Sequence, residues 1–181
     1  MTDASDITTC DPAPGYRPCV GAVLVKTDGL LWIGRRSDHP ENVRDDNLWQ
    51  MPQGGIDPGE DPTRAVLREL YEETNVRRVT VLAETCGWLR YDIPKELLGQ
   101  GLWKGRFRGQ TQKWFLLRFD GAEAEIDIAS PAGGAHKPEF DAWRWAAADD
   151  VIDVAVAFKR DVYRAVIGEF APRIADLRAA G

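Results

Sequence analysis

The stretch GGIDPGEDPTRAVLRELYEETNV, residues 54–76, decides how this chain folds. It opens on a turn rich in Gly and Pro and continues into residues that favour helices. Asp61 and Pro62 are residue types preferred at the N-cap and at the first position of a helix. Asn75 tolerates the left-handed backbone conformation that commonly ends one. The stretch therefore predicts a turn followed by a helix from about Pro62 to Thr74.

The predicted helix carries a crowded acidic face. On a helical wheel, its apolar side chains cluster on one side: Val66, Leu67, Leu70 and Tyr71. The carboxylates at spacings i, i+3 and i+4 fall together on roughly the opposite side: Glu69, Glu72 and Glu73. Like charges at these spacings repel by a few tenths of a kcal/mol per pair in water. The group is either a solvated surface, with Arg68 pairing to Glu72 or Glu60, or a site for a positive ligand.

Divalent metal ions are the positive ligands that suit such a face. Mg²⁺ and Mn²⁺ prefer oxygen ligands and keep their other positions for water and substrate phosphates. Zn²⁺ fits less well, because the sequence holds no cluster of His and Cys. Gly54 and Gly55 let the backbone bend tightly against the carboxylates and bring its carbonyls near them. The stretch thus predicts a Mg²⁺ or Mn²⁺ site for phosphoryl chemistry.

Composition argues against several classes of protein. A net charge of −6 disfavours a protein that coats nucleic acid through bulk electrostatics, so any nucleotide contact should be local. No apolar run is long enough to predict a membrane span. The cysteines form no CxxC pair and suit a reducing cytoplasm. Residues 1–14 lack the pattern of a signal peptide and are expected to form a disordered tail before a single domain at 15–178.

Other segments predict a sheet around this helix. Apolar, partly β-branched residues at 17–26 and 30–34 indicate a hairpin. Further strands are expected at 48–53, 78–91, 112–119 and 140–147. From about residue 158, an apolar stripe with a four-residue repeat indicates a helix packed on the sheet: Val162, Val166, Phe170 and Ile174. Pro172 would kink or divide this helix. The order of elements predicts one mixed α/β domain.

Residues 54–76 resemble the Nudix box, G-x5-E-x7-R-E-U-x-E-E-x-G-U, where U is a bulky apolar residue. The matching positions are Gly54, Glu60, Arg68, Glu69, Leu70, Glu72, Glu73 and Val76. The one departure is Asn75 at the last glycine of the pattern, and Asn also accepts a left-handed backbone. The resemblance implies a Nudix fold, an α/β/α sandwich with a mixed sheet. It also implies hydrolysis of nucleoside diphosphates linked to another moiety, with Arg68 in the catalytic group and Mg²⁺ bound by Gly54, Glu69, Glu72 and Glu73.

The flanking segments resemble one subfamily, the bacterial RNA pyrophosphohydrolases and the similar dinucleoside polyphosphate hydrolases. The similarity covers about residues 15–177. It is carried by GYRPCVG at 15–21, WQMPQGGIDPGE at 49–60, WLRYDIPKEL at 88–97, GQTQKWFLL at 109–117, PEFDAWRW at 138–145 and AFKRDVYRAV at 157–166. Longer loops at 37–47 and near 129–137 depart from the subfamily and could alter substrate access.

The resemblance assigns roles to three charged residues outside the box. Arg17 and Arg36 are expected to hold polyphosphate oxygens, which a planar and permanently charged guanidinium suits. Taken alone, each would instead be interpreted as part of a surface ion pair. Glu139 is expected to be a further metal ligand or a base, where the sequence alone shows an exposed loop acid.

Four more residues are expected at the nucleotide. Phe158 and Lys159 resemble the place where the subfamily grips the 5′-terminal nucleotides, the ring by stacking on a base and the ammonium by meeting phosphate. The alternative for Phe158 is packing at the start of a helix. Val156 is expected to contact the base. Tyr91 matches a tyrosine of the dinucleoside polyphosphate hydrolases, or else fills the core.

Together these observations predict a Mg²⁺-dependent pyrophosphohydrolase, in which Mn²⁺ or another divalent cation could substitute. Its expected substrate is the 5′-triphosphate end of RNA, left as a 5′-monophosphate, or a dinucleoside polyphosphate such as diadenosine tetraphosphate, split to ATP and AMP. The candidates for the base are Glu69, Glu72, Glu73 and Glu139. A cytoplasmic monomer without a membrane partner is expected. The alternatives are a non-catalytic nucleotide sensor of the same fold, or an enzyme for a nucleotide sugar or a damaged nucleoside triphosphate.

Overall fold

The computed structural model describes residues 7–37, 48–94 and 106–180. Within these ranges the strands are β1 (Thr8–Thr9), β2 (Arg17–Val25), β3 (Leu31–Arg36), β4 (Trp49–Gln50), β5 (Gln53–Gly55), β6 (Val79–Glu84), β7 (Trp88–Asp92), β8 (Gly109–Phe119) and β9 (Phe140–Ala146). The helices are α2 (Pro62–Thr74), α3 (Pro131–Gly134), α4 (Ala148–Asp153) and α5 (Arg160–Ala180), with 3₁₀ turns η1 (Glu123–Glu125) and η2 (Ala157–Lys159).

The described strands form one mixed sheet. Its main order is β1-β7-β8-β2-β3-β4, with β5 paired to β2, β6 paired to β8 and β9 paired to β3. β2 and β8 run parallel along their length, and the other pairs are antiparallel. The predicted hairpin is present where Val25 pairs with Leu31, after which β2 and β3 take different partners.

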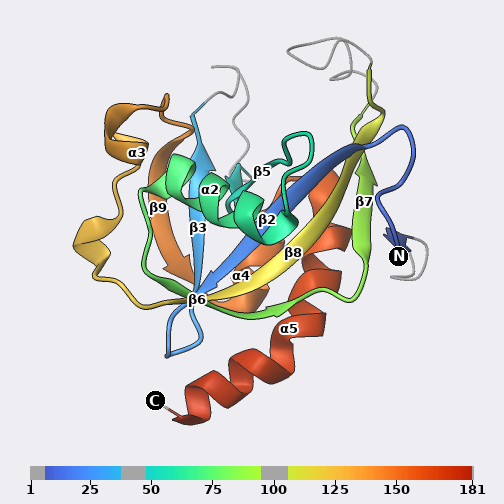
Figure 1. The fold of residues 1–181 in the computed structure, drawn as a ribbon. Helices are drawn as coiled ribbons and strands as arrows, with labels where there is room; N and C mark the ends of the chain where they lie inside the picture. Colours follow the sequence, from blue (N-terminus) through green and yellow to red (C-terminus); the bar gives the residue numbers. More distant parts are fainter. Residues whose placement is uncertain (1–6, 38–47, 95–105, 181) are drawn as a thin grey trace.

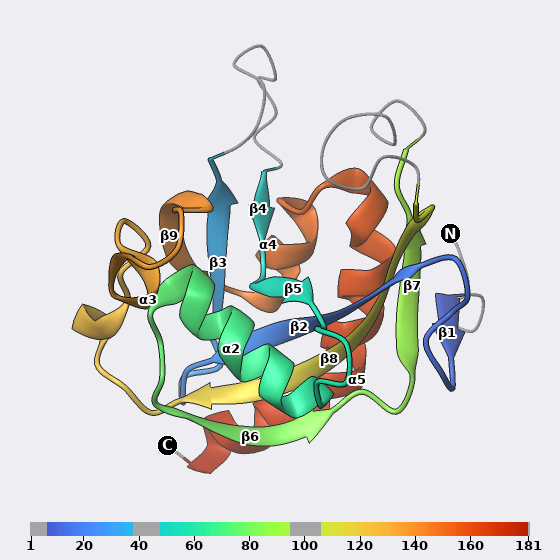
Figure 2. The same ribbon diagram turned by 45° about the horizontal axis from the view of Figure 1, so that its top comes forward.

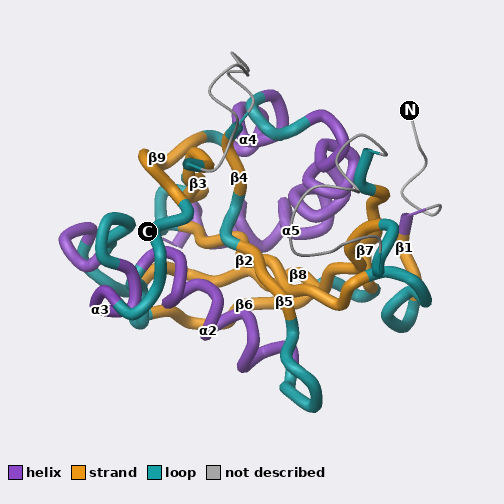
Figure 3. Tube along the Cα trace, turned by 90° about the horizontal axis from the view of Figure 1, so that it is seen from above, coloured by secondary structure: helices purple, strands orange, loops and turns teal. Residues whose placement is uncertain are grey.

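Helices cover both faces of this sheet, as Figures 1 and 3 show. Alternating residues of β2 point to opposite sides. Val23 and Val25 join the core beneath α5, whereas Ala22 and Leu24 join the core beneath α2. The predicted α/β/α sandwich is therefore confirmed. No helix within the described ranges is long and apolar enough to cross a membrane.

Helix α2 begins and ends where the sequence predicted. The carboxylate of its N-cap, Asp61, accepts hydrogen bonds from the backbone N–H groups of Thr63 and Arg64 at 2.9 and 3.2 Å. At the other end, Asn75 has a left-handed backbone with φ of 66°, and its N–H donates to the carbonyl of Tyr71 at 2.9 Å. The Asn75 side chain adds a hydrogen bond to the carbonyl of Glu125, which a glycine could not make.

The faces of α2 differ from the predicted wheel. Leu67 is 38% exposed, whereas Glu73 is only 2% exposed and lies among the buried residues of the helix. The wheel predicted the reverse for both. Glu73 turns inward because the backbone N–H of Gln53, on the adjacent β5, donates to its carboxylate at 3.0 Å. One glutamate of the acidic face is therefore part of the interior.

Other predicted boundaries also change. Residues 7–14, expected in a disordered tail, lie against the sheet: Thr8 pairs with Leu89 of β7, and the N–H of Ala13 donates to the Thr111 hydroxyl at 3.3 Å. Residues 1–6 and 38–47 lie outside the described residues, so the predicted loop at 37–47 is not compared. The single strand expected at 78–91 is two strands, β6 and β7. α5 buries its predicted stripe and is not divided at Pro172.

Candidate metal and substrate site

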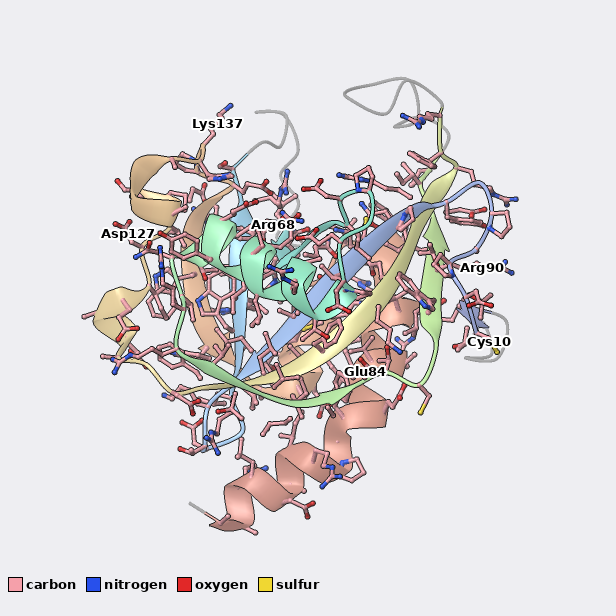
Figure 4. The ribbon with its side chains drawn as sticks, viewed as in Figure 1. Cys10, Arg68, Glu84, Arg90, Asp127 and Lys137 are labelled. Carbon is pink, nitrogen blue, oxygen red and sulfur yellow. The ribbon has the colours of Figure 1, made fainter. Side chains whose placement is uncertain are left out.

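Arg68 joins the turn before α2 to the helix itself. Its guanidinium donates to both carboxylate oxygens of Glu60, from Nε at 2.8 Å and from Nη2 at 2.7 Å. Nη2 also donates to the carbonyl of Gly55 at 2.9 Å. Hydrogen bonding from Arg68 is the main reason that the pKa of Glu60 falls to about 2. These hydrogen bonds tie the turn to α2, on which Figure 4 labels Arg68.

The same guanidinium reaches two of the predicted metal ligands. Nη1 of Arg68 donates to Glu69 at 2.8 Å and to Glu72 at 3.1 Å. The second contact has the i, i+4 spacing of a helical ion pair. Burial raises the pKa of Glu69, and the charges of Glu72 and Glu139 raise it further, against the lowering effect of Arg68. One cation therefore offsets only part of the repulsion within this group.

Glu73 is the most deeply placed of the acidic residues. Burial raises its pKa well above the usual range, and the negative charges of Glu139 and Glu69 act in the same direction. The hydrogen bond from Gln53 and the charge of Arg36 oppose this shift only in part. The surroundings of Glu73 therefore disfavour its charged form unless a further positive charge is near.

Two glycines allow charged groups to lie directly on the backbone of β5. A Cβ added to Gly54 would overlap the carboxyl group of Glu69, and one added to Gly55 would overlap the guanidinium of Arg17. These close approaches require glycine at both positions. They bring Glu69 from α2 and Arg17 from β2 to opposite ends of the same Gly-Gly step.

Arg36 ends β3, Glu139 immediately precedes β9, and the two side chains meet. Nη1 of Arg36, at the end of β3, donates to Glu139 Oε2 at 2.5 Å. The neighbouring Arg35 pairs instead with the exposed Asp141 at 2.6 Å. The charges of Arg36 and Glu139 both affect the pKa of Glu73. The ion pair expected from the sequence alone and the proximity expected from the resemblance are therefore both present.

The chemistry of these donors fits a hard divalent cation, but their orientation does not yet form its site. The carboxylates are partly desolvated and repel one another, which a divalent cation would relieve. However, no three Asp, Glu, His or Cys side chains among the described residues are grouped closely enough to hold a metal ion. In this arrangement Arg68 holds Glu69 and Glu72, and the N–H of Gln53 holds Glu73. The metal-binding role expected of these three glutamates stays a prediction.

The predicted nucleotide residues lie together on the α5 side of the sheet. The rings of Tyr91 and Phe158 have centroids 5.5 Å apart. Nζ of Lys159 lies 5.9 Å from the centroid of the Tyr91 ring and donates to Oε1 of Gln50 at 2.8 Å. Tyr91 and Lys159 are each 8% exposed, whereas Phe158 and Val156 are half-buried. The structure thus brings these residues together and also supports the packing interpretation of Tyr91.

A chain of buried and half-buried amides connects this group to β5, where Glu73 is held, and sequence reasoning missed it. The amide of Gln112 donates to Gln53 at 3.0 Å and to Gln110 at 2.9 Å, and Gln53 donates to Gln50 at 3.3 Å. Nε2 of Gln50 is buried without a hydrogen-bond partner among the described residues. The alternation of Gln110 and Gln112 along one strand is the signal that could have predicted a polar patch.

Three comparisons place this chain among known proteins. A family model described as the NUDIX domain matches residues 15–166. A protein of Bradyrhizobium sp. (strain ORS 278) named RNA pyrophosphohydrolase is 55% identical over 156 residues, which is 86% of this chain and 92% of that protein. A protein of Rhodopseudomonas palustris (strain BisB18) with the same name is 53% identical over 165 residues, or 91% of this chain and 93% of its own.

Solved structures with much lower identity share the fold. The C. elegans Ap4A hydrolase, in a binary complex, superposes with a TM-score of 0.59 at 21% identity and covers 86% of this chain and 98% of its own. The E. coli dihydroneopterin triphosphate pyrophosphohydrolase has the same TM-score at 18% identity, with coverage of 82% and 94%. Because the family model covers most of the chain and the relatives match nearly their whole length, this chain belongs to the Nudix family.

Proposed function

We propose that this chain is a Mg²⁺-dependent pyrophosphohydrolase acting on the 5′-triphosphate end of RNA. Hydrolysis would leave a 5′-monophosphate and release pyrophosphate, or phosphate in two steps. The observation that carries the proposal is the meeting of three groups: the acidic residues of α2, the arginines Arg17 and Arg36, and the Tyr91–Phe158–Lys159 group. The names of relatives that are 52–55% identical support the same substrate.

The enzyme uses a divalent metal ion, and Mg²⁺ is proposed as that ion. The residues proposed to hold it are Glu69, Glu72, Glu73 and Glu139, with the carbonyl of Gly54. Bound there, it would neutralise charge on the phosphates and lower the pKa of a bound water. For Glu72 and Glu139 to serve, their carboxylates have to turn from Arg68 and Arg36, which a competing positive charge makes favourable.

The chain's own residues prepare the acidic face for this exchange. Arg68 holds Glu60, Glu69 and Glu72 together, so their repulsion does not spread the turn and the helix apart. The base that takes a proton from the attacking water is one of the four glutamates. Of Glu69 and Glu73, both with raised pKa values, Glu73 is the more deeply buried and has the pKa raised further, so it gains more from a nearby cation.

Arg17 and Arg36 are proposed to hold the polyphosphate. Arg17 lies against Gly55, the neighbour of the Gly54 that Glu69 approaches, so a phosphate that Arg17 binds is within two residues of β5 from the acidic face. Arg36 can exchange the Glu139 carboxylate for a phosphate oxygen, since guanidinium binds both anions with similar geometry. Such an exchange would free Glu139 for the metal ion at the moment when substrate arrives.

The nucleotide is proposed to contact Phe158, Tyr91, Lys159 and Val156. The ring of Phe158 is half-buried and can accept a stacked base, and the ring of Tyr91 packs against it. The Lys159 ammonium is held by Gln50 and lies at the end of the amide chain that reaches Gln53. This arrangement links the base-binding end of the site to β5, where Glu73 is anchored.

Dinucleoside polyphosphates are the second candidate substrate. The observation that favours them is Tyr91, which lies against Phe158 where the resemblance to dinucleoside polyphosphate hydrolases requires a tyrosine near the nucleotide. The same acidic face would then split diadenosine tetraphosphate to ATP and AMP.

The proposal also includes a single domain at residues 15–178, which acts as a monomer in the cytoplasm.

The test compares kcat/KM on 5′-triphosphate RNA and on diadenosine tetraphosphate at equal Mg²⁺. A tenfold preference corresponds to about 1.4 kcal/mol in transition-state binding and identifies the better substrate. We expect RNA to be preferred. Nucleotide binding without product, with and without Mg²⁺, would overturn the proposal in favour of a non-catalytic sensor.

A further inference from the structure

We propose that Arg90, Arg106 and Arg108, with the rings of Tyr16 and Phe107, form a surface that binds the RNA chain beyond its 5′-terminal nucleotides. We call these five residues the arginine surface. The inference rests on the proposed function, because it assumes an RNA substrate whose 5′ end lies in the site described above. It goes further by assigning a path to the rest of the RNA chain.

The arginine surface alternates guanidinium groups with aromatic rings. Cζ of Arg90 lies 5.8 Å from the centroid of the Tyr16 ring, and Cζ of Arg108 lies 5.2 Å from the same centroid. Cζ of Arg106 lies 5.4 Å from the centroid of the Phe107 ring. These distances are within the range of cation–π contacts. Planar cations and rings side by side are the groups that bind single-stranded nucleic acid, through its phosphates and bases respectively.

The surface is locally positive, whereas the chain as a whole is negatively charged. Three guanidinium groups gather here, and the Asp92 carboxylate accepts from Arg108 at 2.8 Å and from the Tyr16 hydroxyl at 2.5 Å. The chain as a whole carries a net charge of −6. The Arg108 side chain is 63% exposed, so phosphates can reach it without displacing Asp92. A positive surface on an acidic protein suits a polyanion that binds at one place.

The arginine surface adjoins the proposed 5′-end site at the beginnings of β2 and β8. Gln110 of β8 pairs on one side with Arg17 and on the other with Tyr91. Arg108 precedes Gln110 by two residues, and its N–H donates to the carbonyl of Gly15 at 3.1 Å. At the usual spacings of a sheet, the Cα atoms of Arg17 and Arg108 are roughly 8 Å apart. Figure 2 shows the beginnings of β2 and β8 next to the end of β7, and Figure 4 shows Arg90 on that strand.

This position favours RNA over a dinucleoside polyphosphate. Both substrates can supply a polyphosphate to Arg17 and a base to Phe158. Only RNA continues as a chain of phosphates beyond the first nucleotides and can therefore occupy the arginine surface. The surface should lower KM for longer RNA without changing the chemical step, because its contacts are the same in the ground state and the transition state.

The test uses two substrates that share their 5′ sequence, a 5′-triphosphorylated dinucleotide and a 5′-triphosphorylated 12-nucleotide single strand. In the double variant R106A/R108A, we expect KM for the 12-nucleotide RNA to rise at least tenfold, with kcat and both constants for the dinucleotide unchanged. The slope of log KM against log salt for the longer RNA should fall by about 1.4, which is about 0.7 for each lost phosphate contact.

The double variant R77A/R78A is the matched control. Arg77 stacks on the Tyr71 ring and Arg78 pairs with Glu125, so this variant removes the same charge and the same kinds of contact. These arginines precede β6, whose first residue pairs with the far end of β8. We expect the control to keep wild-type KM and salt slope on both RNAs. An equal effect of both double variants, or no effect of R106A/R108A, would overturn the inference.

A separate binding measurement keeps this result distinct from the proposed activity. Fluorescence anisotropy of a labelled 12-nucleotide RNA with a 5′-hydroxyl end needs no hydrolysis. If the wild type hydrolyses neither RNA, the proposed function fails. The arginine surface still stands if R106A/R108A then binds this RNA at least tenfold more weakly than R77A/R78A, and it falls if the two variants bind equally.

Discussion

The Arg68 guanidinium, in the middle of α2, donates two hydrogen bonds at 2.8 and 2.7 Å to the carboxylate of Glu60, in the turn that precedes the helix. This paired geometry fixes the direction of the guanidinium, so its remaining nitrogen points at Glu69 and Glu72. The contact therefore both fixes the backbone of the turn and reduces the repulsion between the carboxylates. It closes the Gly- and Pro-rich turn, and it keeps the acidic residues of the helix together.

Replacing Arg68 should destabilise the fold. Arg68→Ala leaves partly buried carboxylates without their cation, and we expect the free energy of unfolding to fall by about 2–4 kcal/mol. Urea denaturation in the presence of EDTA measures it. Arg64→Ala, at an exposed position of the same helix, is the control and should change stability by less than about 0.5 kcal/mol. Equal values for the two variants would contradict the role given to Arg68.

The Glu60 carboxylate, which pairs with Arg68, should make the free energy of unfolding fall in acid. Its folded-state pKa, about 2, is below the unfolded value of about 4.3, so the folded state binds this proton more weakly. The stabilisation is present above about pH 4.3 and is lost as pH falls toward 2. Wild-type protein should therefore be more stable than Glu60→Gln at pH 7, with the difference shrinking below pH 4. A difference that stays constant with pH would show that Glu60 acts without its charge.

Glu73 should show the opposite pH dependence in metal-free protein. Burial raises its folded-state pKa above the unfolded value, so the cost to the fold grows as pH rises above the unfolded pKa and is complete once pH exceeds the folded pKa. Below the unfolded pKa both states are protonated and the cost disappears. We expect Glu73→Gln to be more stable than wild type at pH 8 and equal to it near pH 4, by urea denaturation with EDTA. A variant less stable than wild type at pH 8 would refute this.

Much of the fold followed from local sequence signals. Asp61, Pro62 and Asn75 predicted the bounds of α2 because caps are set by nearby residues. The stripe of α5 was equally local, since helical periodicity is visible in one segment. The tail was harder: no pattern within residues 7–14 shows that Thr8 pairs with β7, because that contact depends on a strand about eighty residues away.

The sequence predicted which residues belong to the site but not how their side chains are arranged. The box supplied the identity of the acidic residues, yet a helical wheel could not show that β5 draws Glu73 into the interior. The amide chain joins Gln50 and Gln53 to Gln112, which lies 59 residues beyond Gln53, so no single motif contains it. Ion pairs such as Arg36 with Glu139 depend on the register of β3 and β9, which the sequence does not specify.

The hydrolytic activity should depend on Gly54 because no Cβ fits there, and not because of glycine's flexible backbone. A Cβ at this residue would overlap the Glu69 carboxyl group, so Gly54→Ala has to displace a proposed metal ligand. We expect kcat to fall by at least tenfold at saturating Mg²⁺. The control is Gly168→Ala in α5, where an added Cβ meets open space, and which should keep kcat while raising stability by about 0.5–1 kcal/mol. Wild-type kcat in Gly54→Ala would remove Glu69 from the proposed site.

We propose that four glutamates of the site act together in a Mg²⁺-dependent hydrolysis. The most direct test measures the turnover of a single variant at each of them. Glu69→Gln, Glu72→Gln, Glu73→Gln and Glu139→Gln are each measured on 5′-triphosphate RNA under saturating Mg²⁺, with the exposed Glu84→Gln as control. We predict that at least one box variant loses about a hundredfold or more in kcat, while the control keeps wild-type turnover. Near wild-type turnover in all four variants would contradict the account.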